Sequence, residues 1–320
     1  MTSAETLQSH ISVLCQSERV PHSTGYKIAQ EYIQDQIQSL GHPVYTQDFH
    51  DFKVGKCRNI FTETGPGQGK RLLIGAHYES KASSGVAADD NASAVAISLE
   101  LLKNISPSIP ASFVYFDIEE NFGWGGLHGS KAFQKFYKKE VMGVIIFDLV
   151  GGNLAPGFEP IYFQFGNFLT PLHHPALQFY QFPMLFLEPL GKHGARSDYD
   201  RFRRHHIPYT FFSSGTPWYY HTPNDTPEIL NFSKMSLFTE ALLNRLNDPL
   251  PVESAGEIKS WDDFLKFISK LSAQPILQTR LLSKLKKKKR PPNRIEILRM
   301  YSQLLPRLKK AGNELWTTAS

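Results

Sequence analysis

Apolar runs of strand length, separated by segments with helical spacing, constrain the fold of this chain more than any other feature. Several of the runs are apolar on both faces, which is typical of buried strands in parallel sheets. The alternation of strand and helix predicts an α/β layered fold with a mostly parallel central sheet flanked by helices. The predicted strands are RLLIGAHY (71–78), SFVYFDIE (112–119), GVIIFDLV (143–150), IYFQFG (161–166) and IPYTFFS (207–213).

Other segments carry the spacing of amphipathic helices. In residues 23–41, the clearest case, apolar side chains recur at helical intervals. Ser23 or Thr24 can cap the start of this helix, and Gly41 can close its end. The other predicted helices of the main domain are 5–15, 92–104 and 129–141.

The length of 320 residues suits one large domain with a small appendage. Charge is placed unevenly, because residues 251–320 hold 15 Lys and Arg against 6 Asp and Glu, a net charge of +9. The whole chain has a net charge of +5, so residues 1–250 carry −4 and show no electrostatic footprint for nucleic acid. We predict a main domain over residues 1–247, a linker over 248–260 and a basic helical extension over 261–320.

Two cysteines, Cys15 and Cys57, are the whole thiol content of the chain. A core of this size needs no disulfide framework, so we expect both thiols to be free. The first residues, MTSAETLQSHISVLC, lack the positive and apolar regions of a secretory signal, and no apolar run is long enough to span a bilayer. These features predict a cytoplasmic protein without a membrane span.

Side chains that can bind a metal stand at or near the ends of the predicted strands. In open parallel sheets, ligands bind outside the carboxyl ends of the strands, so these side chains should converge at one edge. Taken singly, each is more often a helix cap or a satisfied partner. Together they favour zinc, which accepts histidine nitrogen and carboxylate oxygen. The set is His77, Glu119, Glu120 and Asp148 near strand ends, His221 in a later loop, and Asp90 in GVAADDNASAV (85–95).

Adjacent acids raise the question of how the work is divided between them. Asp89 and Asp90 precede a predicted helix, where an acid can cap the helix or hold a metal. A carboxylate has two oxygens and can bridge two metal ions, which polarise a water that attacks a carbonyl at neutral pH. That water needs a general base within hydrogen-bond reach. Glu119 and Glu120 can divide these tasks, one binding metal while the other faces the water.

Six motifs, in their order along the chain, resemble the co-catalytic zinc aminopeptidase family. They are GAHYES, AADDNASAVA, DIEENFGWGGLHGS, IIFDLVGG, SDYDRF and YYHTPNDT, and the resemblance covers roughly residues 5–245. That family includes bacterial leucyl aminopeptidases, folate-hydrolase-type carboxypeptidases and animal-type glutaminyl cyclases. The resemblance implies a three-layer zinc-peptidase fold and makes residues 1–247 a zinc-dependent peptidase catalytic domain. The motifs are specific as a set, whereas no single one is.

The resemblance also implies a role for each candidate residue. Asp90 matches the bridging aspartate, and Glu119 matches the general base. Asp148 matches a ligand that also helps to hold the amino group of the substrate in aminopeptidases. The peptide bond after the bridging aspartate is often cis in the family, which predicts a cis Asp90–Asn91 bond. The implied ligand sets are His77, Asp90 and Asp148 for one ion, and Asp90, Glu120 and His221 for the other.

Some positions depart from the family's pattern. Glu79 stands where an aspartate usually orients the first histidine, so a longer acid must reach the second ring nitrogen. SDYDRF has Tyr199 where a histidine is common, and Asp198 beside it can support a ligand or make a local turn bond. Tyr220 can donate to a developing oxyanion or simply pack. Asp89 is predicted to cap the helix or to support the ligand beside it.

These observations predict a zinc metallopeptidase of the aminopeptidase type, which acts on a peptide or small amino-acyl substrate with two zinc ions and Glu119 as base. The alternative is a glutaminyl cyclase-like acyltransferase with a single zinc, although such cyclases carry tryptophan where Tyr220 stands. A non-catalytic scaffold on the same fold is less expected, because every ligand and base position is present. We expect no specific nucleic acid partner, and KLKKKKRPP in the basic tail can make electrostatic contacts.

Overall fold

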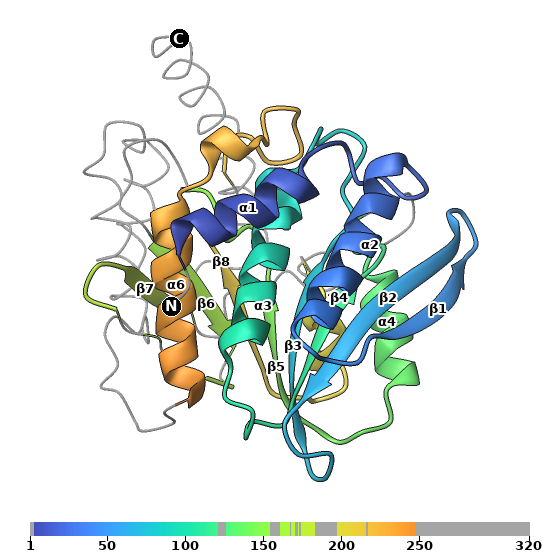
Figure 1. Ribbon diagram of the computed structural model, residues 1–320, viewed down its shortest axis with the longest axis vertical. Coiled ribbons are helices and arrows are strands. Elements are labelled where there is room, and N and C mark those ends of the chain that lie inside the picture. Colours follow the sequence, from blue (N-terminus) through green and yellow to red (C-terminus); the bar gives the residue numbers. More distant parts are fainter. Residues whose placement is uncertain are drawn as a thin grey trace, which may run out of the picture.

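The computed structural model describes residues 3–120, 126–153, 161–166, 168–169, 172, 174–182, 197–215 and 217–247 (Figure 1). The predicted linker and basic extension lie outside the described residues, as does the NFGWG stretch that follows the paired glutamates. None of the described helices has the length and apolar character needed to cross a membrane. The helices are α1 (Ala4–Leu14), α2 (Thr24–Ser39), α3 (Ser93–Asn104), α4 (His128–Phe136), α5 (Tyr199–Arg203) and α6 (Phe232–Asn247), with short helical turns η1 (Ala88–Ala92) and η4 (Pro227–Ile229). The strands are β1 (Tyr45–Asp51), β2 (Gly55–Thr64), β3 (Arg71–His77), β4 (Ala111–Phe116), β5 (Val141–Phe147), β6 (Ile161–Gly166), β7 (Gln178–Phe182) and β8 (Tyr209–Ser213).

The described strands form one sheet of eight strands in the order β1-β2-β4-β3-β5-β8-β6-β7. Its centre, β4-β3-β5-β8, is parallel, and β6 also pairs with β7 in parallel. The remaining pairings are antiparallel, namely β1 with β2, β2 with β4, and β6 with β8. The predicted α/β class is therefore confirmed, but the sheet is mixed rather than mostly parallel.

The mixed character arises from β1 and β2, which are not among the predicted strands, and from β6, which is a predicted strand but runs antiparallel to β8. β1 and β2 form an antiparallel hairpin at one edge of the sheet. Along β1, the buried positions are the polar residues Gln47 and Asp51, so the alternation of a half-buried strand is hidden in the sequence. β7 and the long helix α6 are likewise not among the predicted elements. The predicted strands are the parallel centre together with β6, because only these segments are continuously apolar.

Helices cover both faces of the sheet and give the molecule three layers (Figure 1). Along β3, Leu72 and Ile74 pack in a core cluster with residues of α1, α2, α3 and α6. Leu73, between them, belongs to the cluster on the other face, with residues of α4 and α5. This alternation follows from the two-residue period of a strand. The parallel centre is thus buried on both faces, as its apolar sequence predicts.

The first two helices begin where the sequence offers a cap. The Oγ of Ser3 accepts a hydrogen bond from the backbone N–H of Thr6, and the Oγ of Ser23 accepts one from that of Tyr26, each at 3.1 Å. Ser23 rather than Thr24 is therefore the cap of α2. Gly41, just after the end of α2, has a φ of 77°, a left-handed conformation that favours glycine.

Both cysteines are free thiols, as predicted. Burial raises the pKa of Cys15 to about 11 and that of Cys57 to about 12. Both thiols therefore stay protonated near neutral pH. They are weak nucleophiles there, because the thiolate is the reactive form.

Truncation of Phe238 in α6 should destabilise the fold. Its ring is fully buried and stacks on Tyr162, with centroids 4.2 Å apart, and it contacts Phe212 across the sheet interface at 5.2 Å. We expect Phe238→Ala to lower the free energy of unfolding by about 3–5 kcal/mol, measured by denaturant titration. Phe52→Ala is the matched control, because Phe52 is 74% exposed and its loss should be nearly neutral. Equal effects of the two variants would contradict the packing of α6.

Candidate metal centre

Neighbouring strands of the parallel centre end at the same edge of the sheet and bring candidate side chains together there. β3 ends with His77, which pairs with Phe116 at the end of β4. Glu119 and Glu120 follow β4 closely, and Asp148 directly follows β5. The convergence follows from the parallel direction of the three strands.

Two further candidates come from segments outside the sheet. Asp90 lies in η1, directly before α3, with a non-helical backbone at φ −114° and ψ 77°. The Asp90–Asn91 peptide bond is cis, as predicted. His221 lies between β8 and η4 and has a φ of 57°. The site is therefore assembled from the ends of strands and from two loops that approach them.

Asp90 faces a different histidine with each of its carboxylate oxygens. Its Oδ1 lies 3.5 Å from Nε2 of His77, and its Oδ2 lies 3.2 Å from Nε2 of His221. Oδ1 of Asp148 lies 3.8 Å from the same nitrogen of His77. Oε1 of Glu120 lies 2.9 Å from the same nitrogen of His221. The described residues form three groups that could hold a metal ion, and two of them consist of predicted ligands and share Asp90. The third joins His77 and Glu120 to Glu119, the predicted base.

Both groups that share Asp90 suit a metal ion. Within each group, the possible ligand atoms all lie within 4.8 Å of one another. Nε2 of His77 and Oδ1 of Asp148 are buried without a hydrogen-bond partner in the described part of the protein, which costs free energy unless something else binds them. Imidazole nitrogen and carboxylate oxygen are donors that zinc accepts. The arrangement fits zinc, and the ligand roles themselves remain our prediction.

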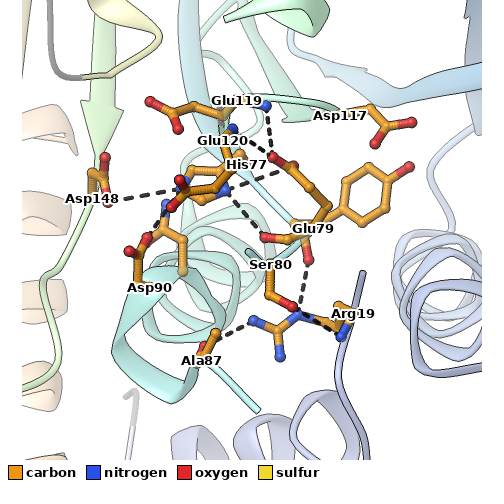
Figure 2. A network of polar contacts seen from close by, with 12 residues as sticks. Arg19, His77, Glu79, Ser80, Ala87, Asp90, Asp117, Glu119, Glu120 and Asp148 are labelled. Carbon is orange, nitrogen blue, oxygen red and sulfur yellow. Dashed lines mark hydrogen bonds and ion pairs between the residues drawn. The ribbon is translucent and has the colours of Figure 1, made fainter. Parts of the chain in front are cut away.

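Glu79 connects the strand-end residues to one another (Figure 2). Its Oε1 accepts hydrogen bonds from the backbone N–H groups of Glu119 at 2.6 Å and Glu120 at 2.9 Å. Its Oε2 lies 3.6 Å from Nδ1 of His77, and its backbone oxygen lies 3.2 Å from the same nitrogen. The backbone oxygen of Glu79, and not its carboxylate, is therefore within hydrogen-bond distance of the second ring nitrogen. The carboxylate fixes the loop that carries the paired glutamates.

Asp89 lies in η1 beside Asp90, and its carboxylate binds other segments of the chain instead of belonging to either ligand group. Its Oδ1 accepts a hydrogen bond from the backbone N–H of Gly151 at 2.7 Å, and its Oδ2 accepts one from the hydroxyl of Tyr219 at 2.6 Å. Sequence reasoning missed Asp225, whose carboxylate accepts hydrogen bonds from the backbone N–H groups of Asp89 at 2.7 Å and Asp90 at 3.0 Å. Its place in the motif YYHTPNDT is the signal that could have identified it.

Two side chains flank His221. The ring of Tyr220 stacks on the imidazole, with centroids 3.7 Å apart. Burial, together with the charges of Asp90 and Glu120, raises the pKa of Tyr220 well above its usual value, so its hydroxyl stays protonated and can donate a hydrogen bond. Lys81, which the sequence patterns do not indicate, places its Nζ 3.0 Å from Nδ1 of His221.

The SDYDRF motif lies at the start of α5. Tyr199 stacks on Tyr209, with centroids 5.0 Å apart, and belongs to a core cluster, so its ring packs in the core. Asp198 is fully buried. Burial raises the pKa of Asp198 to about 7, and the carboxylates of Glu79 and Asp148 add to the rise. The charges of the site therefore affect the pKa of Asp198, although Asp198 belongs to neither ligand group.

The cluster is electrostatically unbalanced without a cation. Burial raises the pKa of Glu119 well above its usual range, and the charge of Glu120 adds to this, although His77 opposes it. Burial also raises the pKa of Glu120 to about 7. Burial acts in the same direction on Asp90, but its contacts with His221 and His77 outweigh burial and lower the pKa of Asp90. A bound metal ion would favour the charged form of each carboxylate.

Comparison with known proteins gives one family. The model of peptidase family M28 matches residues 59–245, a stretch that contains all six motifs quoted above. The uncharacterized protein YfbL of Escherichia coli (strain K12) is 27% identical over 254 residues, which cover 68% of this chain and 78% of YfbL. Glutaminyl-peptide cyclotransferase of Drosophila melanogaster is 29% identical over 171 residues, which cover 46% of this chain and 47% of that protein.

Solved structures agree on the architecture. A Zn-dependent exopeptidase from Parabacteroides distasonis ATCC 8503 superposes with a TM-score of 0.60 at 19% sequence identity, covering 77% of this chain and 98% of that chain. At this level of identity the likeness shows the fold alone. It confirms the predicted zinc-peptidase architecture over the part of the chain that superposes.

Zinc affinity should depend steeply on pH. Burial lowers the pKa of His221, but hydrogen bonds with Asp90 and Glu120 outweigh burial and raise it to about 9. A protonated imidazole cannot bind a metal, so zinc must displace a proton from His221 below that pH. We expect the affinity to rise about tenfold per pH unit for each proton displaced, and to level off above the pKa. Competition with a chromophoric chelator across this range measures it, and an affinity independent of pH would contradict the assignment of His221.

Proposed function

Because the chain belongs to peptidase family M28, we propose that it is a zinc-dependent exopeptidase that removes N-terminal residues from peptides. One observation carries the two-zinc form of this proposal. The oxygens of Asp90 face Nε2 of His77 at 3.5 Å and Nε2 of His221 at 3.2 Å, as a bridging carboxylate requires. Asp148 completes the first group and Glu120 the second.

When bound, zinc in these groups would polarise the substrate carbonyl and lower the pKa of a water. Glu119 then serves as general base, taking a proton from the attacking water and passing it to the leaving amine. Its surroundings suit both transfers, because burial raises the pKa of Glu119 and makes its protonated form accessible. Glu79 keeps the backbone of Glu119 in place through the hydrogen bond at 2.6 Å.

Two further side chains are proposed to bind the substrate. The carboxylate of Asp148 has two oxygens, so while one completes the first ligand group the negative charge of the other suits the N-terminal ammonium group. The protonated hydroxyl of Tyr220 suits the carbonyl oxygen as this oxygen gains negative charge. Together they would place the first residue of a peptide, rather than an internal one, beside Glu119.

A second candidate is glutaminyl cyclisation, which the match to the Drosophila cyclotransferase favours. In that reaction, the N-terminal amine attacks the side-chain amide of glutamine, a new C–N bond closes the ring, and ammonia leaves. Glu119 would carry the proton from the amine to the leaving nitrogen. The group of Asp90, Glu120 and His221 is complete without His77, so it can serve a reaction that uses one zinc.

Replacing the proposed base tests the chemistry. We expect Glu119→Gln to lower kcat by ~100-fold or more, because the amide keeps the shape of the side chain and cannot accept a proton. Zinc content and melting temperature should stay near those of the wild type. Glu140→Gln is the matched control, since the side chain of Glu140 is 66% exposed at the surface. A Glu119→Gln variant with full activity would remove Glu119 from the mechanism.

The zinc content per chain distinguishes the two candidate functions. We expect two tightly held zinc ions after saturation and removal of loosely bound metal, because both ligand groups are preformed. The measurement is elemental analysis, paired with assays on an amino-acyl reporter and on a peptide with N-terminal glutamine. One zinc ion, with conversion of the glutamine peptide alone, would favour the cyclase over the peptidase.

A further inference from the structure

Arg19 lies in the segment between α1 and α2 and is fully buried. Its guanidinium donates hydrogen bonds to backbone oxygens from three parts of the chain. Nε donates to Tyr78 at 2.8 Å, Nη2 donates to Ala87 at 2.8 Å, and Nη1 donates to Leu14 at 2.8 Å and Val86 at 2.7 Å. Because this buried charge binds backbone carbonyl groups and not a carboxylate, it constrains the backbone of the segments to which those groups belong.

The carbonyl groups that Arg19 binds belong to the two loops that carry metal ligands. Tyr78 stands between His77 and Glu79 in the loop after β3. Val86 and Ala87 lead directly into η1, which carries Asp90. Figure 2 shows Arg19 beneath both loops, with contacts to Ser80 on one side and Ala87 on the other.

The backbone of Arg19 strengthens the link to the first loop. Its N–H donates to Oγ of Ser80 at 3.0 Å, and its carbonyl oxygen accepts from the N–H of Ser80 at 3.1 Å. On the second loop, Ala87 has a φ of 49°, a left-handed conformation that an alanine rarely adopts. The hydrogen bond from Nη2 of Arg19 is made to the carbonyl oxygen of this residue, at the point where the backbone turns into η1.

We propose that Arg19 is a positioning residue of the metal centre, which sets the distance between His77 and Asp90 by holding their two loops to one guanidinium. Asp225 holds the same loop from the other side, through the N–H of Asp90. The inference rests on the proposed zinc site. It also extends the functional unit beyond the family match, because Arg19 lies well before residue 59, where that match begins.

The planar guanidinium is necessary for this task. Arginine presents five N–H donors in a rigid fork, whereas lysine has one nitrogen on a flexible stem. One ammonium group cannot reach carbonyl groups that belong to three segments. Arg19→Lys therefore keeps the charge and removes the simultaneous contacts.

Arg71, the first residue of the strand that ends with His77, offers a matched control. It is 1% exposed, and its guanidinium also binds backbone oxygens, among them those of Pro66 at 2.8 Å and Ala111 at 2.7 Å. However, Arg71 stands at the start of β3, whereas His77 stands at its end. Arg71→Lys thus removes similar hydrogen bonds at the end of β3 that lies away from the metal centre.

The test compares the zinc affinity of the two variants in the full chain, by chelator competition, with unfolding curves of the metal-free proteins as the measure of general damage. We expect both variants to unfold more easily. We expect Arg19→Lys to lose ~10-fold or more in zinc affinity, as outer partners of metal ligands do, while Arg71→Lys stays close to the wild type. As a second variant, Arg19→Ala should regain zinc affinity when millimolar ethylguanidinium is added, and not when ethylammonium is added.

The outcomes separate the inference from the proposed function. Wild-type protein that binds no zinc would overturn the proposed site. Zinc-binding wild type with equal losses in both lysine variants, or with no loss in Arg19→Lys, would overturn the inference alone. If neither Arg19 variant folds, the role of Arg19 is general stability, and the inference is likewise overturned.

Discussion

The burial of several carboxylates beside two imidazoles is the constraint on which the rest of the structure depends. Asp90, Glu120 and Asp148 are each exposed by less than a tenth, at a point where the sheet and its covering loops exclude water. Removing an ionised carboxylate from water is costly unless an opposite charge is close. His77 and His221 supply part of that charge. A divalent cation would supply the remainder, which explains why the histidine and aspartate atoms point toward one another and not toward solvent.

The loops around this cluster are held mainly through their backbones. Glu79 and Asp225 each use a carboxylate to accept hydrogen bonds from two backbone N–H groups. Arg19 does the reverse and donates to backbone oxygens. The two kinds of contact meet at η1, where Asp225 accepts from N–H groups and Arg19 donates to the carbonyl group of Ala87 just before it. Away from η1, Glu79 acts on the loop after β4 and Arg19 on the loop after β3.

Sequence reasoning predicted the parts of the fold and site that depend on strong local patterns. The continuous apolar runs identify the parallel centre, and polar residues at their ends identify His77, Glu119 and Asp148. The convergence of these side chains then follows from topology. The resemblance to a family added the choice of Asp90 over Asp89, which stays a prediction, and the carboxylate of Asp89 binds Gly151 and Tyr219 instead.

Most of what sequence reasoning missed depends on tertiary contacts. β1 buries polar side chains, so its sequence lacks the alternation of a half-buried strand. α6 does carry buried apolar residues at helical spacing, namely Met235, Phe238 and Leu242, a pattern that sequence reasoning did not use. Arg19, Lys81 and Asp225 act through contacts with residues distant in sequence. A single sequence carries no local sign of such contacts, because the charge of a residue does not indicate which backbone it binds.

The proposed metal ligands come from separate segments that approach one another only when the sheet has formed. His77 ends β3, His221 follows β8, and both face Asp90 in η1, so the ligand set exists in the native topology and not in an unfolded chain. Metal binding is therefore coupled to folding, and its free energy contributes to the stability of the native state. A chelator would act on this protein as a mild denaturant. Retention of zinc by newly made chains would in turn report that the parallel strands at the centre of the sheet have paired.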